Sequence, residues 1–326
     1  MILIHGGSGF IGQHVAKALL SRGADVVVTS SRGHAPAFLA DEIAARRVYV
    51  EQVDVTDAAA VAGVTEKYKP DTVVDLTGHP PKALAPGKDV LFRSGALVNI
   101  LEAARLSAVS RVVLMSSMDA YWGLGPDAVP FHEDATVPLL EQDDHYIVQS
   151  WAKKALEVIG NLYRRQYGMD IVFVRASGVY GPLYRTFLNV PSRIARAAAK
   201  GTIEFGPQTG GLPFAEDGYD QVYVKDMAEG MALVTTSLTL RFPVYNIGSG
   251  EAPTYQCFVD AASEAAPGFG LRLPSRLESA GPVASGPLDG LWQDISRAKQ
   301  ELGYSPRYSV RHAIAEYVDW LRRHDR

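Results

Sequence analysis

Three glycines near the start of the chain have a spacing that suits contact with phosphate groups. Gly6, Gly9 and Gly12 follow the short apolar run 2–5 and open the amphipathic segment 13–21. A strand that enters a helix through such a turn brings backbone N–H groups close to a pyrophosphate, at the end where the helix dipole favours negative charge. Ordinary turns also use glycine, but the strand before and the helix after favour a dinucleotide-binding turn.

The elements that must position this turn alternate along the first half of the chain. Apolar runs predict strands over 2–5, 25–29, 47–50, 72–76, 111–115 and 170–174. Helical patterns predict helices over 11–22, 35–45, 57–67, 88–107 and 148–167. Strands separated by helices indicate βαβ crossovers, and so an α/β fold with a doubly wound parallel sheet of the Rossmann type.

The composition of the chain changes at about residue 176, where Gly and Pro become more frequent. This change predicts a smaller C-terminal lobe whose loops close over a ligand. We therefore expect a dinucleotide-binding Rossmann domain over 1–175, with returning segments near 218–250, and a mainly substrate-binding lobe over 176–326. A last amphipathic helix is predicted over 310–323.

Overall composition excludes several classes of protein. The chain has 326 residues, 47% of them hydrophobic, which is ample for a sizeable core. A formal net charge of −4 gives no reason to expect a nucleic acid or an anionic membrane as partner. The single cysteine, Cys257, excludes an internal disulfide and a cysteine-based metal cluster within one chain. No apolar run is long enough to span a membrane and Met1 directly precedes the first strand, so we expect a cytoplasmic protein without a metal site.

A series of motifs gives the chain a wider resemblance. In order they are Gly6-Gly-Ser-Gly-Phe-Ile-Gly12, Asp54-Val55, Asn99-Ile-Leu-Glu-Ala-Ala-Arg105, Ser116-Ser117, Arg175-Ala-Ser-Gly-Val-Tyr-Gly-Pro182, Val222-Tyr-Val-Lys-Asp226, Tyr245-Asn-Ile-Gly-Ser-Gly250 and Asp294-Ile-Ser-Arg-Ala-Lys-Gln-Glu-Leu-Gly-Tyr-Ser-Pro306. With these motifs the chain resembles, over nearly its whole length, the extended short-chain dehydrogenases/reductases. This superfamily contains the nucleotide-sugar epimerases and dehydratases.

The resemblance implies a nicotinamide dinucleotide as cofactor. Its pyrophosphate would lie on the glycine turn, which also includes Phe10 and Ile11. Asp54, followed by Val55, is the implied adenine contact. Thr77 and Gly78 are the implied contacts at the end of the fourth strand.

The end of the second strand indicates which dinucleotide is preferred. In members that prefer NAD, this strand ends in an acidic residue that bonds the ribose 2′-hydroxyl. Here the position is Ser30, followed by Ser31 and Arg32. Loss of the carboxylate removes repulsion against a 2′-phosphate, and Arg32 can pair with that phosphate. The sequence therefore favours NADP(H), with NAD(H) possible; the alternative is that Arg32 is only a solvated turn residue.

The family's chemistry uses a Tyr-x-x-x-Lys pair on one helix, a Ser or Thr, and a supporting Asn. Ser117 fits the Ser position, with Tyr121 four residues later. The landmarks Tyr167 and Arg175 follow the catalytic Tyr by about 18 and 26 residues in this family, which places the Lys at Lys153 and the Tyr position at Gln149. An amide has no titratable proton near neutral pH, so Gln149 cannot act as general acid or base.

Other side chains are candidates for the missing phenol. Tyr146 lies three residues, or about one helical turn, before Gln149. His145 is an alternative, as is Asp119, which lies two residues after Ser117, where dehydratases of the superfamily carry an acid used in elimination. Two of these also have a structural interpretation: Tyr146 as a packing residue at a helix start, Asp119 as a solvated turn carboxylate. Lys153 can still bond the nicotinamide ribose.

The substrate positions depart from the family pattern as well. Counting back from the Asn99 motif, the supporting Asn aligns with Arg93. The arginine that clamps the substrate diphosphate aligns with Tyr219, which argues against a standard nucleotide-diphosphate sugar. Tyr180 is a further candidate substrate contact. Three other arginines either replace the clamp or form the polar face of a helix: Arg185, Arg193 and Arg196.

We therefore expect an NADP(H)-dependent oxidoreductase, epimerase or dehydratase that acts on a sugar-like or small hydroxyl or carbonyl substrate. The alternatives are a non-redox lyase or isomerase on the same fold and a non-catalytic cofactor-binding sensor or scaffold. Apolar faces on the predicted helices 88–107 and 148–167 favour a homodimer, because family members pair through these helices.

Overall fold

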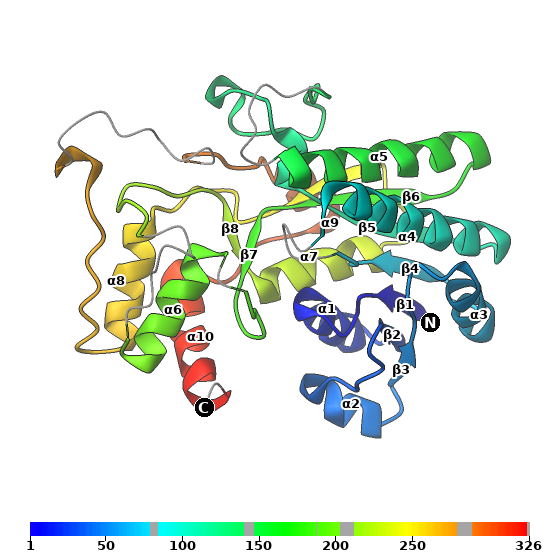
Figure 1. Ribbon diagram of the computed structural model, residues 1–326, viewed down its shortest axis with the longest axis horizontal. Helices are drawn as coiled ribbons and strands as arrows, with labels where there is room; N and C mark the ends of the chain where they lie inside the picture. The colour runs from blue at the N-terminus through cyan, green and yellow to red at the C-terminus, as the bar shows by residue number, and fades with distance from the viewer. Residues whose placement is uncertain (79–83, 140–146, 187, 203–211, 279–288, 325–326) are drawn as a thin grey trace.

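A seven-stranded parallel sheet forms the centre of the protein, in the order β3-β2-β1-β4-β5-β6-β9 (Figure 1). The computed structural model describes residues 1–78, 84–139, 147–186, 188–202, 212–278 and 289–324, with the backbone alone at 147–149 and 277. The strands are β1 (Ile2–His5), β2 (Val26–Ser30), β3 (Val48–Gln52), β4 (Thr72–Asp75), β5 (Arg111–Ser117), β6 (Ile171–Ala176) and β9 (Val244–Ile247). This architecture confirms the predicted α/β fold of Rossmann type.

Helices cover both faces of the sheet, so its central strands are buried on two sides and are nearly all apolar (Figure 1). On one face lie α1 (Phe10–Ser21) and α7 (Val224–Thr236). On the other lie α3 (Ala58–Tyr68), α4 (Pro86–Leu106) and α5 (Ile147–Tyr167). Because the strands are parallel, their carboxyl ends share one edge of the sheet, where ligands bind in such folds.

One predicted helix, over 35–45, is wrong in extent. The chain forms a single 3₁₀ turn, Ala37–Leu39, and then a five-residue helix, α2 (Ala40–Ala44). Pro36 precedes the turn, and Leu39 is the only residue of the two elements that is buried. A longer helix would gain little packing energy here, and isolated short helices are marginal.

The C-terminal part of the chain builds a second core beside the sheet. A two-stranded parallel sheet of β7 (Gly178–Tyr180) and β8 (Gln221–Tyr223) leads into it. Around it pack α6 (Val190–Lys200), α8 (Tyr255–Ala265) and α10 (Val310–His324), whose aromatic and aliphatic side chains fill the space between them. The short α9 (Ser296–Leu302) lies against β9 of the main sheet. In the described part of the chain, no helix is long and apolar enough to cross a membrane.

Candidate cofactor and active site

The glycine turn runs from the end of β1 to the start of α1 and lies against the end of β4. Gly6 has a φ of +74°, and a Cβ built there would lie 2.9 Å from the Leu76 carbonyl oxygen. A Cβ at Gly12 would lie 2.5 Å from the Gly6 carbonyl oxygen. Distances this short leave no room for a side chain at either position. The turn therefore presents backbone at its surface, as a cradle for phosphate requires.

The start of α1 carries the positive end of a helix dipole. The helix begins at Phe10, with Gly9 as its N-cap; no side chain caps it, and its first turn holds no acidic residue. The amides of the first turn, those of Phe10 and Ile11 among them, have no carbonyl partner within the helix. A dinucleotide pyrophosphate supplies both the negative charge and the acceptors that such a helix end lacks. The residues present thus fit the cofactor.

The end of β2 forms a tight turn that leaves a cation exposed. The backbone N–H of Arg32 donates to Ser30 Oγ over 3.2 Å, and Gly33 continues the turn with a φ of +66°. Gln52 Nε2 donates to the Ser31 carbonyl oxygen over 3.3 Å, which ties the turn to β3. Ser31 and Arg32 are exposed, and no carboxylate among the described residues pairs with Arg32. The guanidinium is available to an anion beside this turn.

The residues after β3 are held by local bonds. Asp54 Oδ1 accepts from the Thr56 backbone N–H over 2.9 Å and from Thr56 Oγ1 over 2.7 Å. Val55 is buried, and its carbonyl oxygen accepts from Asn99 Nδ2 of α4 over 3.0 Å. Both residues lie at the edge of the sheet where the glycine turn lies, because β3 and β1 are parallel members of one sheet.

A buried carboxylate orients the residues after β4. Thr77 donates twice to Asp75 Oδ1, from its backbone N–H over 2.9 Å and from Oγ1 over 2.7 Å. Asp75 is only 5% exposed, and its burial raises the pKa of the carboxyl above its ordinary value. A Cβ at Gly78 would lie 3.9 Å from Arg93 Nη1, so the Arg93 guanidinium reaches over the turn that follows β4.

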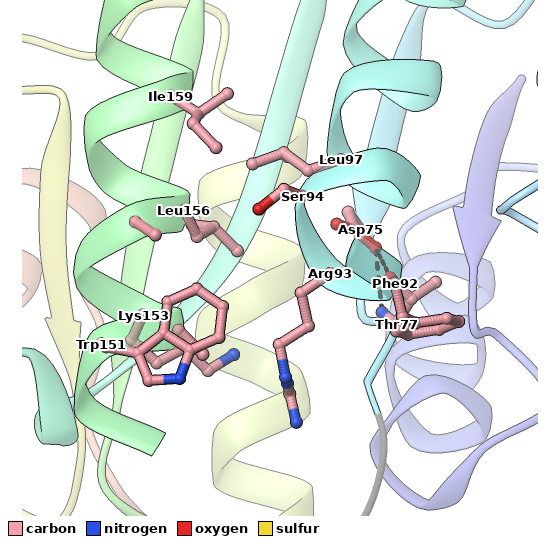
Figure 2. Close-up of a pocket in the computed structure, with 12 residues that line it drawn as sticks. Asp75, Thr77, Phe92, Arg93, Ser94, Leu97, Trp151, Lys153, Leu156 and Ile159 are labelled. Carbon is pink, nitrogen blue, oxygen red and sulfur yellow. Dashed lines mark hydrogen bonds between the residues drawn. The ribbon is translucent and has the colours of Figure 1, made fainter. Parts of the chain in front are cut away.

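A pocket opens between α4 and α5, above the end of β4 (Figure 2). Figure 2 shows Arg93 from α4 and Lys153 from α5 extending toward the same opening, with the Trp151 ring beside them. The walls are apolar and the floor carries Asp75 and Thr77. The walls are formed by Phe92, Leu97, Ala152, Ala155, Leu156 and Ile159. The fold thus brings together Thr77, Arg93 and Lys153, three of the residues singled out from the sequence.

Ser117 and Asp119 lie next to each other at the end of β5. Ser117 is the last residue of the strand, and its Oγ accepts from the Asp119 backbone N–H over 3.1 Å. Asp119 belongs to the 3₁₀ turn Met118–Tyr121, and its charge acts on Lys153. Tyr121 itself is 1% exposed and donates to Asn246 Oδ1 over 2.8 Å. Burial raises the pKa of Tyr121 to about 12, so this phenol does not exchange protons near neutral pH.

Position 149 lies in the first turn of α5, four residues before Lys153. Residues four apart on a helix share a face, so position 149 and Lys153 lie on one face of α5. Tyr146 and His145, the two substitutes proposed for the phenol from this segment, lie outside the described residues.

A buried ionic network, which sequence reasoning did not assign, fixes α5 on the sheet. Arg175 of β6 donates to Glu157 in a bidentate pair, from Nε over 2.9 Å and from Nη2 over 2.7 Å. Ser116 Oγ donates to the same carboxylate over 2.6 Å. The Arg175 guanidinium also lies 4.6 Å from the centre of the Tyr121 ring. Since Glu157 is one turn beyond Lys153, this network sets where Lys153 lies relative to β5.

The positions considered for substrate have different surroundings. The structure places Tyr180 in the second core, where it is 1% exposed and packs against Tyr223 and Phe258. Among the described residues, this side chain contributes to the packing of the second core. Tyr219 is half-buried, and its ring lies 2.8 Å from where a Cβ would stand on Gly178.

The three arginines do not share one polar helix face. Arg185 is exposed and precedes α6, whereas Arg193 within α6 is only 7% exposed. Arg196 donates to the Tyr184 carbonyl oxygen. Burial lowers the pKa of Arg193, and the phenols of Tyr184, Tyr219 and Tyr255 counter that change. Arg193 therefore belongs to the interior of the smaller lobe, near Tyr219.

Comparison with known proteins agrees with this fold. A family profile, the NAD dependent epimerase/dehydratase family, matches residues 2–248. The chain belongs to that family. It is thus an enzyme of the NAD(P)-dependent epimerase/dehydratase type.

Characterised relatives match the chain almost end to end. A dTDP-4-dehydro-6-deoxy-D-allose reductase from a Streptomyces species is 26% identical over 100% of this chain and 97% of the relative. A UDP-glucuronate 4-epimerase from Thermodesulfobacterium geofontis is 25% identical over 98% of this chain and 95% of the relative. These relatives catalyse different reactions, so the match shows the family and does not single out one of its reactions.

Solved structures share the fold. The UDP-glucose 4-epimerase of Thermotoga maritima, determined with UDP-glucose, superposes with a TM-score of 0.80 at 22% identity, covering 100% of this chain and 99% of the other. The UDP-glucose 4-epimerase of Thermus thermophilus, determined in complex with NAD, gives a TM-score of 0.75 at 25% identity and covers 98% of each chain.

Asp75 is the clearest site residue that sequence reasoning missed. It ends the run Thr72-Val-Val-Asp75, so a charged residue directly follows two valines at the carboxyl end of a buried strand. A carboxylate in that place, two residues before a predicted cofactor contact, is a signal that the sequence does contain. Among the described residues, no group of His, Cys, Asp and Glu side chains is arranged to hold a metal ion.

Proposed function

We propose that the protein is an NADP(H)-preferring enzyme that moves hydride at a hydroxyl- or carbonyl-bearing carbon of a sugar-like substrate. In this proposal Gln149 occupies the position of the family's phenol. When bound, the cofactor accepts and returns the hydride. The chain's own residues hold the cofactor, orient the substrate oxygen and transfer the proton. The observation that carries the proposal is the exposed cation beside an uncapped dinucleotide turn.

The preference for NADP(H) rests on the turn at the end of β2. Ser30 leaves this strand end without the carboxylate that would repel a 2′-phosphate, and the exposed Arg32 lies two residues further on. The glycine turn, Asp54 and Thr77 hold the parts that the two dinucleotides have in common. Solved relatives contain NAD, so the proposal is that Ser30 and Arg32 change the preference of a shared site.

The proposal that Gln149 replaces the family's phenol is supported by the positions of Lys153 and Glu157 on the same helix. Lys153 enters the pocket, and Glu157 bonds Arg175, as expected if α5 is in the family's register. With that register, residue 149 stands where the phenol would be. Ser117 remains at the end of β5 to bond the substrate oxygen, and Lys153 remains to bond the nicotinamide ribose.

One alternative has support from a charge interaction. The Asp119 charge acts on Lys153, so the carboxylate lies near the pocket. An acid at that place suits an elimination, which would make the protein a dehydratase or lyase. A sensor or scaffold that only binds the cofactor is the other alternative, and a protein of that kind should tolerate Ser117→Ala and Lys153→Ala in cells.

The apolar faces of α4 and α5 support a homodimer. Part of each predicted face is core, since Leu97, Leu101 and Ala152 are buried. Other apolar side chains on the same helices remain open to solvent: Val90, Leu91, Val158 and Leu162. Large apolar side chains gathered on two neighbouring helices are typical of an interface between protein chains.

The test is a fluorescence titration of the purified protein with NADPH and NADH in parallel. Wild type should bind NADPH more tightly, and Arg32→Ala should lose about tenfold in NADPH affinity, or about 1.4 kcal/mol, as expected for one exposed charge-assisted bond. NADH affinity should stay unchanged. Arg272→Ala, which removes an exposed arginine of the smaller lobe, is the matched control. Equal affinity for both cofactors in wild type would refute the preference, and binding of neither would remove the enzymatic proposal.

A further inference from the structure

The Lys153 ammonium faces the pocket with most of its hydrogen-bonding capacity unused. It has three N–H donors, and within the described residues its Nζ makes one hydrogen bond, to the Met115 carbonyl oxygen over 2.8 Å. That bond anchors the amine at the end of β5, beside Ser117. The pocket lies on its other side (Figure 2). Lys153 can therefore contact a ligand in the pocket directly.

Charged groups from four elements surround this amine: Asp75 of β4, Arg93 of α4, Asp119 of the turn after β5, and Glu157 of its own helix. The Glu157 carboxylate is paired with Arg175 and accepts from Ser116, so much of its charge is compensated. Burial disfavours the ionised form of Asp75. Arg93 is a second cation at the same opening, and its charge repels that of the ammonium.

These surroundings make the amine release its proton more easily than an ordinary lysine does. Desolvation is the largest cause of a lowered pKa at Lys153, and Arg93 lowers the pKa further. Asp75, Asp119 and Glu157 act in the opposite direction, and the net direction is downward. A proton-transfer group works best when its pKa approaches the working pH.

We propose that the Lys153 amine is the group that exchanges the substrate's proton, and that Arg93 is a positioning residue that weakens the hold of the amine on that proton. This inference rests on the proposed function, in which no phenol stands at position 149. On oxidation, the substrate O–H bond breaks and its proton passes to the lone pair of Nζ. The C–H bond would break with it, and the nicotinamide of NAD(P)⁺ held at the glycine turn would accept its electron pair as hydride. On reduction, both return to the carbonyl group.

The first test follows the amine directly, without cofactor or substrate. The protein is labelled briefly with acetic anhydride over a range of pH, and the labelling of each lysine is measured by mass spectrometry. Only the neutral amine reacts, so the pH of half-maximal labelling reports each pKa. Lys67 is an internal control, because its hydrogen bond to Glu51 raises its pKa. Lys153 should be half-labelled at a lower pH than Lys67, and an equal or higher pH would overturn the proposal.

The second test removes the positive charge at Arg93. Arg93→Gln should move the half-labelling pH of Lys153 upward and leave that of Lys67 unchanged. Arg93 is paired with Asp89, whose side chain is 5% exposed, over 2.7 Å. Because an unpaired buried carboxylate destabilises a fold, the double variant Asp89→Asn, Arg93→Gln is measured alongside. A Lys153 labelling curve that stays in place in a folded double variant would show that Arg93 does not have this role.

The third test separates proton transfer from binding. Lys153→Arg keeps a positive charge but cannot release a proton near neutral pH. It should still bind NADPH, within a few fold of wild type, and should lose turnover by at least a hundredfold. Retained turnover with an unchanged pH profile would overturn the proposal. If wild type instead binds no dinucleotide, the proposed function fails, whatever the labelling shows.

Discussion

A single methyl group at Gly12 should damage the cofactor site more than it damages the fold. A Cβ there would lie 2.5 Å from the Gly6 carbonyl oxygen and 2.6 Å from the Gly7 Cα, both backbone atoms that cannot rotate away. The turn must shift by several tenths of an ångström to admit it. Overpacking of this kind costs about 1–3 kcal/mol. For 326 residues the unfolding entropy is about 0.7 kcal/mol per degree, so Tm should fall by about 2–4 °C.

The expected loss of cofactor affinity is larger than this change in Tm suggests. The shift moves the amides that start α1, and misplacing two of them costs about 2–3 kcal/mol, or roughly 30- to 150-fold in affinity for NADPH. Affinity for NADH should fall by the same factor, because the pyrophosphate is common to both.

The matched control is Gly63→Ala on α3. A Cβ at Gly63 would meet nothing within 4 Å, and alanine is favoured over glycine inside a helix by about 0.5–1 kcal/mol. This variant should bind both cofactors as wild type does and should melt slightly higher. Thermal unfolding and fluorescence titration of the three proteins check both effects. NADPH affinity in Gly12→Ala equal to that of Gly63→Ala would refute the assignment of the turn to the pyrophosphate.

Two further predictions concern assembly and pH. The combined variant Leu91→Glu, Leu162→Glu should reduce the mass measured by light scattering at micromolar concentration from that of a dimer to that of a monomer. The control Leu238→Glu, at a side chain that is 95% exposed, should leave the mass unchanged. A monomeric wild type would contradict the proposed dimer. Burial lowers the pKa of His5 and His14 from 6.5 to about 4. As the pH falls, the two histidines therefore bind protons in the unfolded chain before they do so in the folded protein. The contribution of each histidine to the free energy of unfolding is full above about pH 7 and should decrease by about 2 kcal/mol between pH 7 and 5. Urea unfolding at pH 7 and pH 5 measures this loss of stability, and His14→Phe should roughly halve it. Equal stability at the two pH values would show that both imidazoles are charged in the folded protein at pH 5.

The strands that sequence reasoning located well are those that are buried on both faces. β1, β4 and β6 have no exposed residue, and each contains a run of consecutive apolar residues. The strands β7 and β8 have three residues each, too few for any pattern to emerge. β9 is as long as β1 and β4, but its sequence Val-Tyr-Asn-Ile includes the polar Asn246, so it is not a continuous apolar run.

The glycine turn between β1 and α1 could be predicted because its parts are contiguous in the sequence. The pocket could not, because Arg93 and Lys153 come from helices separated by β5 and are brought together only by the crossover geometry. The buried location of Arg193 was equally hidden, since it depends on how α6 packs against α8 and α10. In each case the sequence shows which residues share a helix or strand, whereas their contacts with other elements depend on how those elements pack.

The ionic network on α5 is consistent with the proposal that Gln149 replaces the family's phenol while the rest of the site is kept. Glu157 binds α5 to β5 through Ser116 and to β6 through Arg175, and a buried pair of this kind is costly to break. Because Lys153 lies one turn from Glu157, its place in the pocket is fixed by this network and does not depend on a side chain at 149. Retained cofactor geometry and altered proton chemistry are therefore compatible in one site. For the same reason, Lys153→Arg tests proton transfer and Glu157→Gln tests the scaffold that positions it.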